Sequence, residues 1–437
     1  MTRIWRIDAD FSRRSIDEID FAVIANCKKI RVHPHDPRNP RPHYQKSYLS
    51  AMFSTTQKIG ILGGGQLGKM LCLAAAPWDF KTYVLDASPD FPAGQVCTEF
   101  TVGDFNNYDD VMAFGRDKDV LTIEIEHVNT AALHELKRMG KQVHPSPDAL
   151  DIIKDKGLQK VFYRNNEIPT APFELFENEQ DLLSAIDSGR WSLPLVQKSR
   201  TAGYDGKGVA ILRTSDDLKT KLLKGPCLVE LLAPIQTEIA VIAARNASGE
   251  VAVFPAVEMD FHPEANLVEL LICPARISPL VSAQAEVLAE QVISAFDICG
   301  LLAVEMFLCT DGQLWVNEVA PRPHNSGHHT IDSAVTSQYQ QHLRAICGLP
   351  LGDTSQMQAA LMLNLLGAEG HKGPVRYEGV AECLAISVVH VHLYGKAMTA
   401  PFRKMGHVTI TAETLEKAFK KADFIKNTLK VFSQTQE

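Results

Sequence analysis

Apolar and polar positions alternate along the first part of this chain in a pattern that predicts strands separated by helices. Short apolar runs occupy residues 58–63, 81–87, 120–126 and 141–145, and helical or loop segments lie between them. Strands that alternate with helices are typical of a parallel sheet covered by helices. We therefore predict an α/β domain over residues 53–150.

Residues 151–350 predict a second and larger domain of α+β type, with two lobes that divide near residue 233. A helix that carries Lys156 opens the first lobe, and strands and a glycine-rich loop follow it. In the second lobe, apolar runs on both sides of Ser248 and Gly249 predict a hairpin, because glycine suits a tight turn between strands.

The last and first segments of the chain differ from these two domains. Residues 351–437 predict a small β-rich domain, in which residues 383–395 have a strand pattern and residues 414–429 form a closing amphipathic helix. Residues 1–52 are rich in Pro, Arg and His and have no sustained periodicity. That composition is typical of a disordered extension.

Charge and cysteine content exclude several classes of protein. The formal net charge of -8 over 437 residues argues against a general nucleic-acid binder. Nine cysteines are scattered without a CxxC pair, which is typical of reduced thiols and not of disulfides or a zinc site. No apolar run approaches the roughly 18 residues that span a membrane. We therefore predict a cytoplasmic protein with small-molecule partners.

The stretch KIGILGGGQLGKM raises the question of a bound dinucleotide. Gly63, Gly65 and Gly68 have the GxGxxG spacing, a strand precedes them, and a helix begins at Gln66. Asp86 ends the next predicted strand about twenty residues later, where a dinucleotide fold has its ribose ligand. These residues favour an NAD-dependent oxidoreductase. Three glycines after a strand are also a common structural turn, in which helix and strand pack closely.

A second glycine-rich segment, QKSRTAGYDGKGV, suits a polyphosphate. Gly203, Gly206 and Gly208 supply flexible backbone, and Lys198 and Lys207 lie beside them. Backbone donors and ammonium groups together can neutralise phosphate charge. The segment lacks the Walker pattern, in which GKS or GKT opens a helix. A hairpin turn with solvated lysines is the alternative.

Two glutamates in LLAVEMFLCTDGQLWVNEVAPR are predicted to face each other. Asp311 and Gly312 form a favoured two-residue turn, and Glu305 and Glu318 lie at equal distances from it on two apolar strands. Facing like charges destabilise a sheet, so we expect a cation between them and, without it, a raised pKa at one carboxylate. Magnesium prefers such oxygen ligands. A slipped register or a solvated pair is the alternative.

Four strings, in their order along the chain, resemble the ATP-grasp superfamily. They are GGGQLGKM, GYDGKG, NEVAPRPHNSGH and FRKMGH. Within the superfamily, residues 57–430 are most similar to the 5-(carboxyamino)imidazole ribonucleotide synthases. The resemblance implies an ATP-grasp fold, preceded by a Rossmann-like N-terminal domain and followed by the small C-terminal domain. In this family the glycine turn helps to bind a ribonucleotide and no dinucleotide.

The activity implied by this resemblance belongs to purine biosynthesis. Bicarbonate is joined to the exocyclic amine of 5-aminoimidazole ribonucleotide, ATP is cleaved to ADP and phosphate, and carboxyphosphate is the intermediate. The implied cofactors are ATP and Mg²⁺, and the implied assembly is a homodimer. A related ATP-grasp enzyme that uses formate would differ only in the acceptor pocket. A non-catalytic nucleotide-binding module is a third alternative, disfavoured because both proposed magnesium ligands are present.

The resemblance also implies roles for individual residues. Glu305 and Glu318 hold magnesium, and Arg322 and His324 are the catalytic residues. The residues that bind ATP are Lys156, Lys198, Gly203, Tyr204, Asp205, Gly206, Lys207, Gly208, Glu230, Leu231, Leu232, Ala233, Glu238, Asn317 and Glu318. The residues around the ribonucleotide and the reacting groups are Gln66, Asn325, Ser326, His328, Lys396, Arg403 and Lys404.

Three positions depart from the family pattern. Lys156 stands where the family often has arginine, which keeps the charge but loses the planar fork. TIEIEHV replaces the more usual YEFENV, which leaves the roles of Glu126 and His127 open. His329 follows His328 where an aromatic residue is frequent.

Overall fold

The computed structural model describes residues 54–201, 208–262 and 267–433. The predicted extension at residues 1–52 lies outside these ranges, and so does segment 203–207 of the glycine-rich loop. Among the residues described, no helix is long and apolar enough to cross a membrane.

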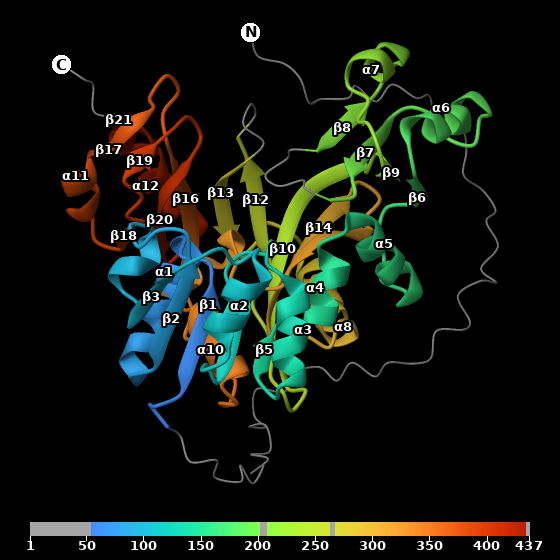
Figure 1. Cartoon of the computed structure of the whole chain (residues 1–437). Coiled ribbons are helices and arrows are strands. Elements are labelled where there is room, and N and C mark those ends of the chain that lie inside the picture. The colour runs from blue at the N-terminus through green and yellow to red at the C-terminus, as the bar shows by residue number, and fades with distance from the viewer. Residues whose placement is uncertain (1–53, 202–207, 263–266, 434–437) are drawn as a thin grey trace, which may run out of the picture. The chain divides into compact units, whose positions relative to one another are not determined.

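The first domain is built on a five-stranded parallel sheet in the order β3-β2-β1-β4-β5 (Figure 1). Four of its strands coincide with the predicted apolar runs. The edge strand β3 is only four residues long and has no fully buried residue, so its sequence has no continuous apolar run. The elements are β1 (Lys58–Leu62), α1 (Gln66–Ala75), β2 (Lys81–Asp86), β3 (Glu99–Val102), α2 (Tyr108–Gly115), β4 (Val120–Ile123), α3 (Thr130–Arg138) and β5 (Gln142–His144).

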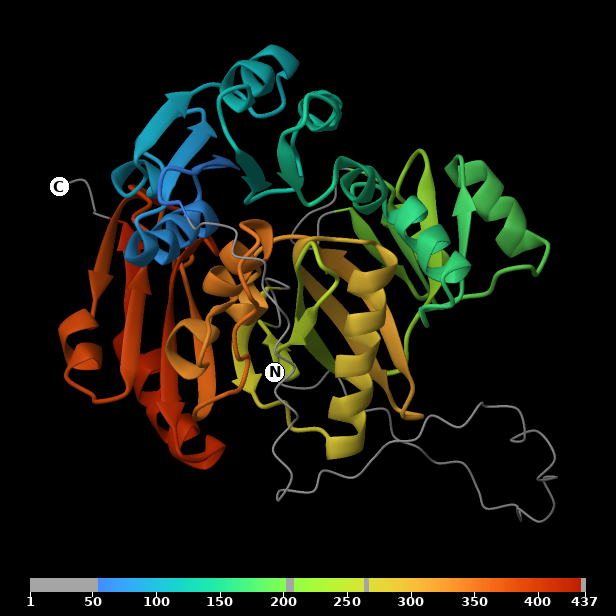
Figure 2. The same cartoon turned by 90° about the horizontal axis from the view of Figure 1, so that it is seen from below.

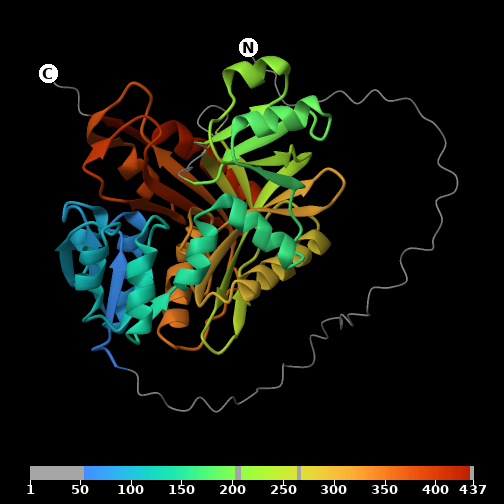
Figure 3. The ribbon, with the colours of Figure 1, turned by 45° about the vertical axis from the view of Figure 1, so that its right-hand side comes forward.

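The first lobe of the second domain has its own four-stranded antiparallel sheet, in the order β6-β9-β7-β8. Two helices, α4 (Pro147–Ile153) and α5 (Lys156–Asn165), lead from the first sheet to this lobe (Figure 3). The lobe contains β6 (Phe173–Phe176), α6 (Glu179–Asp187), β7 (Leu195–Ser199), β8 (Val209–Leu212), α7 (Ser215–Thr220) and β9 (Cys227–Leu231).

One continuous sheet joins the second lobe to the C-terminal region. Its order is β15-β14-β10-β12-β13-β16-β20-β18, with β11 paired to β10. Backbone pairing between Leu270–Cys273 and Ala360–Leu363 links the two parts. The strands are β10 (Ile235–Arg245), β11 (Val251–Val253), β12 (Val257–Phe261), β13 (Val268–Cys273), β14 (Gly300–Cys309), β15 (Leu314–Ala320), β16 (Ala359–Leu366), β18 (Val389–Leu393) and β20 (Lys404–Ala412).

A long helix forms the main core of the second lobe. Helix α8 (Pro279–Ala295) packs on β10 and β14 (Figure 2). Its buried residues Leu288 and Val292 join Ile239 and Val304 of these strands in one apolar cluster. This burial fixes the position of β14. Val304 and Met306 of β14 face the apolar cluster, and Glu305 between them points to the opposite face of the sheet. The predicted hairpin about Ser248 is confirmed by the pairing of β10 with β11.

Two expectations for the C-terminal region are corrected. Residues 383–395 do not form one strand, because helix α11 (Val380–Leu384) ends there and β18 begins only at Val389. Apolar residues of a short buried helix and of a strand look alike in sequence. Helix α12 (Leu415–Thr428) is the predicted closing helix, but a further strand follows it. A small sheet contains β19 (Met398–Thr399), β17 (Gly373–Glu378) and β21 (Lys430–Ser433).

Candidate active site

The hairpin of β14 and β15 carries the two predicted metal ligands. Glu305 pairs directly with Glu318, as the sequence predicts. The turn itself differs from the prediction, because the N–H of Cys309 donates to the carbonyl of Gln313 and the loop has three residues instead of two. A register shift after Glu305 then inserts Asn317 into β15 as a bulge. The longer loop and the bulge offset each other, which restores the predicted pairing.

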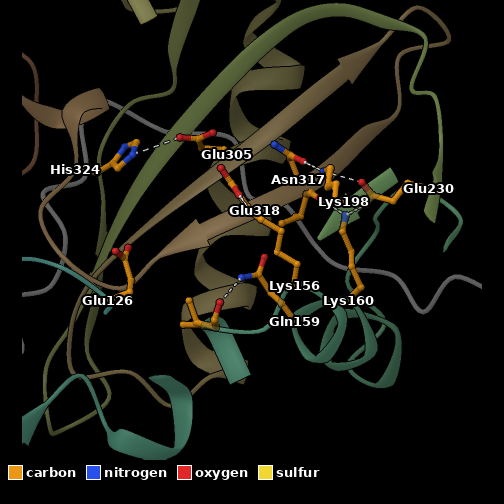
Figure 4. A network of polar contacts seen from close by, with 12 residues as sticks. Glu126, Lys156, Gln159, Lys160, Lys198, Glu230, Glu305, Asn317, Glu318 and His324 are labelled. Atoms are coloured by element: carbon orange, nitrogen blue, oxygen red, sulfur yellow. Dashed lines mark hydrogen bonds and ion pairs between the residues drawn. The ribbon is translucent and has the colours of Figure 1, made fainter. Parts of the chain in front are cut away.

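Side chains from other elements meet these glutamates (Figure 4). Lys156, the first residue of α5, places Nζ 2.6 Å from Oε2 of Glu318. Nε2 of His324 lies 3.4 Å from Oε1 of Glu305. Lys198 on β7 donates to Oδ1 of the bulge residue Asn317 at 2.9 Å. Two lysines and a histidine from three segments therefore converge on the hairpin.

The two glutamates differ in their charge states. Burial raises the pKa of Glu305 well above its ordinary value, and the neighbouring Glu318 raises it further. Partial burial acts on Glu318 in the same direction, although its side chain is 43% exposed, but Lys156 outweighs this effect and holds the pKa of Glu318 below its ordinary value. The expectation of one raised pKa in the facing pair is confirmed, and the raised group is Glu305.

Glu230 on β9 lies between two lysines. Its Oε1 is 2.5 Å from Nζ of Lys160, an ion pair without hydrogen-bond geometry, and its Oε2 is 2.6 Å from Nζ of Lys198. The side chains of Glu230 and Lys160 are 5% and 3% exposed. Burial lowers the pKa of Lys160 to about 8. Burial would raise the pKa of Glu230, but the two lysines lower it to about 2. The sequence singles out no role for Lys160.

The other residues expected around the nucleotide lie near the same hairpin. Glu238 on β10 is diagonal to Glu305 across the paired strands, and burial raises its pKa to about 7. Leu231 is 44% exposed, and the chain runs on through Leu232 and Ala233 to β10. A small cavity between the lobes is lined by Lys156, Gln159, Lys160, Lys198, Leu228, Asn317 and Glu318.

Arg322 opens the acceptor loop, residues 322–328, and is held by the first domain. Its Nη2 lies 2.9 Å from Oε1 of Glu126, and its Nη1 donates to the carbonyl of Pro323 at 3.0 Å. Glu126, whose role the sequence leaves open, is therefore the counter-ion of Arg322. Nε of Arg322 is buried and has no hydrogen-bond partner within the described ranges. A buried N–H of this kind is a donor for a bound anion.

His324 presents a neutral imidazole to Glu305. The N–H of Ser326 donates to Nδ1 at 3.3 Å, so the ring proton is assigned to Nε2, which faces the glutamate. Burial and the nearby Arg322 lower the pKa of His324 to about 3. At neutral pH the ring is therefore a hydrogen-bond donor toward Glu305.

Three further residues of the acceptor loop, Asn325, Ser326 and His328, are buried or bonded within the protein and so stabilise the loop. Ser326 and His328 are 2% and 1% exposed. The ring of His328 lies 4.8 Å from the ring of His407 on β20. Asn325 exchanges two amide hydrogen bonds with Asn364 on β16, at 2.9 and 3.0 Å. In this structure these side chains stabilise the loop against the C-terminal strands.

The predicted cations of the C-terminal region differ in their contacts. Lys404 begins β20, and its charge acts on the carboxyl of Glu305. Nζ of Lys396 donates to the carbonyl of Lys404 at 2.8 Å. Arg403 is exposed and donates to the carbonyl of Met398 at 2.6 Å. Lys404 therefore acts electrostatically on the hairpin, and Lys396 contacts the main chain of Lys404.

The glycine turn of the first domain is filled by carboxylates of the protein itself. Glu124, which follows β4, accepts from the N–H groups of Gly65 at 3.1 Å and Gly68 at 2.9 Å. Asp86, expected at a ribose, accepts from the N–H of Gly64 at 2.6 Å. A dinucleotide fold offers these donors to the pyrophosphate. A carboxyl group of the protein therefore occupies the donors that a dinucleotide would need for its pyrophosphate. The strand end TIEIE contains this residue, Glu124, which sequence reasoning missed.

We expect NAD to show no saturable binding in a calorimetric titration, because these donors are already taken. Gly65→Ala should leave this result unchanged. A Cβ at residue 65 would lie 2.4 Å from Oε1 of Glu124, so this variant should lose about 1–3 kcal/mol of the free energy of unfolding. Tight NAD binding by the wild-type protein would restore the oxidoreductase hypothesis.

Three family models match the chain in the order of its parts. The Ribonucleotide synthetase preATP-grasp domain matches residues 56–154, and the ATP-grasp domain matches residues 161–339. The Phosphoribosylaminoimidazole carboxylase C-terminal domain matches residues 360–421.

Curated relatives come from bacteria, fungi and a plant. N5-carboxyaminoimidazole ribonucleotide synthase of Bacillus subtilis is 36% identical over 354 residues, which are 80% of this chain and 90% of the relative. Phosphoribosylaminoimidazole carboxylase of Ogataea methanolica is 37% identical over 384 residues, which are 85% of this chain and 70% of the relative. The chain spans about two thirds of the fungal relatives, with 66% for the carboxylase of Candida glabrata.

Solved structures with similar folds cover most of the chain. N5-carboxyaminoimidazole ribonucleotide synthetase from Thermotoga maritima has a TM-score of 0.79 and 42% identity, and the match covers 87% of this chain and 100% of that one. N5-carboxyaminoimidazole synthase from Aspergillus clavatus, in complex with ADP and 5-aminoimidazole ribonucleotide, has a TM-score of 0.78 and 32% identity, over 85% and 98%.

Proposed function

The chain belongs to the N5-carboxyaminoimidazole ribonucleotide synthase family of ATP-grasp ligases, and on this premise we propose that it joins bicarbonate to the exocyclic amine of 5-aminoimidazole ribonucleotide. ATP is cleaved to ADP and phosphate, and the product enters purine biosynthesis. The observation that carries the proposal is the convergence of Lys156, Lys198 and the acceptor loop on the paired carboxylates of one hairpin. The proposed function covers this reaction alone and no further activity of the longer fungal carboxylases.

The chemistry requires an activated form of bicarbonate, which is a poor electrophile. Transfer of the γ-phosphoryl group to a bicarbonate oxygen gives carboxyphosphate, and the amine then forms the new C–N bond as phosphate leaves. In such a reaction the protein mainly positions the reactants and neutralises charge. Lys156 and Lys198 are proposed to bind the ATP phosphates.

The residues of the hairpin fit a bound magnesium ion. Glu305 and Glu318 face each other, and burial beside neighbouring carboxylates raises the pKa of Glu305. Within the described ranges, no group of three or more His, Cys, Asp or Glu residues could hold a metal by itself. Two carboxylates with substrate phosphates completing the shell are typical of Mg²⁺. When bound, the ion would neutralise charge that develops on the transferred phosphoryl group.

Glu230 is proposed to act through Lys198 in ATP binding. Both of its carboxylate oxygens are engaged by lysines, so it can hold Lys198 at the phosphates while the backbone of Leu231 to Ala233 meets the adenine. Glu238 is proposed to meet the ribose hydroxyls.

The acceptor side is proposed to lie between the first domain and the C-terminal region. Arg322 has an unpartnered buried Nε within the described ranges, which suits it to stabilise carboxyphosphate. His324 would donate from Nε2 to the reacting groups. Lys396, Lys404 and Gln66 are proposed to meet the ribonucleotide phosphate, with Arg403 further out. A homodimer and a cytoplasmic location remain predictions.

The test is ADP release by the purified protein with ATP and magnesium, omitting bicarbonate and 5-aminoimidazole ribonucleotide in turn. We expect ADP release to depend on the ribonucleotide, and the carboxylated product to require bicarbonate. Formate in place of bicarbonate should give no product. Formate-dependent product formation would instead assign the chain to the related carboxylate–amine ligases.

A further inference from the structure

Lys69 ties the first domain to the C-terminal region through main-chain carbonyls. Its Nζ donates to the carbonyl of Leu393 at 3.2 Å and to that of Tyr394 at 3.1 Å. Successive carbonyls of a strand point in opposite directions, so one ammonium can donate to both only where the chain leaves strand geometry. Gly395 supplies that change with φ of 87°, and a Cβ there would lie 3.3 Å from Nζ of Lys69.

Tyr394 is the buried centre of this junction. It is 2% exposed and belongs to the apolar cluster that contains Leu67 and Leu71 of α1. Its hydroxyl lies 3.2 Å from Nδ1 of His407, and its ring meets the ring of His328 edge-on at 6.2 Å. One side chain therefore contacts the glycine-turn helix, the acceptor loop and strand β20.

These three segments carry the residues proposed for the ribonucleotide. Gln66 lies one helical turn before Lys69 in α1, and Lys396 follows Tyr394 by two residues. Lys396 in turn donates to the carbonyl of Lys404, where β20 begins. The groups come from parts of the chain that are more than 300 residues apart in sequence, as the Lys69 contact itself shows with a separation of 324. Their relative placement depends on the contacts at Tyr394.

We propose that Lys69 and Tyr394 are positioning residues of the ribonucleotide site, a proposal that rests on the function proposed above. Lys69 fixes the turn of residues 393–396 against α1, and this fixes the direction in which Lys396 leaves the turn. Tyr394 holds the same turn against the acceptor loop through His328 and His407. The contacts described for Lys69 and Tyr394 lie with residues 393–395, His328, His407 and the cluster of α1, so the two should govern affinity for the ribonucleotide only.

The experiment compares Lys69→Met with Lys81→Met, a matched control in the same domain whose ammonium pairs with the exposed Asp79 at 2.7 Å. We expect Lys69→Met to raise KM for 5-aminoimidazole ribonucleotide about tenfold, since two charge-assisted hydrogen bonds are lost. KM for ATP should stay within about twofold. Lys69→Arg should recover most of the affinity, because a guanidinium can also donate to two carbonyls. The control should match the wild-type protein in both constants.

Tyr394→Phe provides a second variant that keeps the buried ring and removes only the hydroxyl. It should also raise KM for the ribonucleotide and leave KM for ATP unchanged. A fall in melting temperature with an unchanged KM for the ribonucleotide, in both variants, would overturn the positioning role. If the wild-type protein neither binds the ribonucleotide in calorimetry nor responds to it in ADP release, the proposed function and this inference fail together. A normal wild-type response with unaltered variants rejects this inference alone.

Discussion

Glu305→Gln and Glu318→Gln should each reduce magnesium-dependent ADP release by more than about 100-fold, because each removes one of two carboxylates proposed for the ion. The double variant should be little worse than either single one, since both act through one metal unit. ADP release across a magnesium titration measures the effect. Near-normal release by Glu318→Gln at low magnesium would contradict the assignment of the metal site.

The same two variants should differ in stability without ligands. Glu318 is paired with Lys156, so Glu318→Gln should lower the free energy of unfolding by about 1 kcal/mol, a small value because the Glu318 side chain is 43% exposed. Glu305→Gln removes a group that burial already favours in its neutral form, and the melting temperature should stay the same or rise. The sequence alone suggests a symmetrical pair, and the position of Lys156 breaks that symmetry.

The pH dependence of the metal-free protein follows from the same difference. The pKa of Glu305 is raised in the folded state, so the folded state binds more protons than the unfolded state between the ordinary and the raised value. Stability should therefore fall as the pH rises through this window, and Glu305→Gln should flatten the slope. The lowered pKa of Glu318 acts in the opposite sense, since its contribution is lost as the pH falls below the ordinary glutamate range. Melting temperatures across the pH range, with a chelator present, measure both slopes.

Glu230→Gln should produce the largest loss of stability. It removes the shared counter-ion of two lysines whose side chains are 3% and 11% exposed, and it leaves both charges buried. Breaking a buried pair in this way costs about 3–5 kcal/mol. Urea unfolding at neutral pH measures the change. The contribution of Glu230 should also be lost as the pH falls from about 4.5 toward its lowered pKa of about 2.

Glu174→Gln is the matched control for Glu230→Gln. Glu174 lies on β6, opposite Val229 of β9, and pairs with Arg190 at 2.7 Å, but its side chain is 31% exposed. Its replacement should cost less than about 1 kcal/mol. An equal loss in both variants would mean that the burial of the lysines does not govern the energy. The ATP affinity of Glu230→Gln, measured on the folded fraction of this variant, should also fall, because Lys198 loses its ion pair with Glu230.

The hairpin of β14 and β15 shows what the sequence can predict. The pairing of Glu305 with Glu318 follows from apolar strands and a turn, and it is correct although the assumed turn is one residue too short. The bulge at Asn317 compensates, and no local signal reveals it. Strands with buried apolar runs are predictable in the same way, whereas the edge strand β3 has no such run.

Contacts between distant residues account for most of what the sequence does not reveal. The role of Glu124 depends on the pairing of β4 with β1, because its glycine partners lie 56 residues or more away in sequence. Lys160 and Glu230 come from a helix and a strand of different parts of the second domain. Each is an ordinary charged residue in its own segment, and only tertiary packing buries it beside a partner. Similarity to a family supplies such roles where motifs match, and Lys160 lies outside those motifs.

The continuous sheet described above determines which part of the molecule can move. Rotation of the C-terminal region against the second lobe would break the backbone ladder between β13 and β16. The sheet of the first lobe is separate, and the connections at residues 166–172 and 232–234 join it to its neighbours. Closure over a nucleotide is therefore expected as a hinge movement of that lobe alone. The hydrogen bond from Lys198 on β7 to Asn317 on β15 joins the first lobe to the second lobe and would stabilise the closed position.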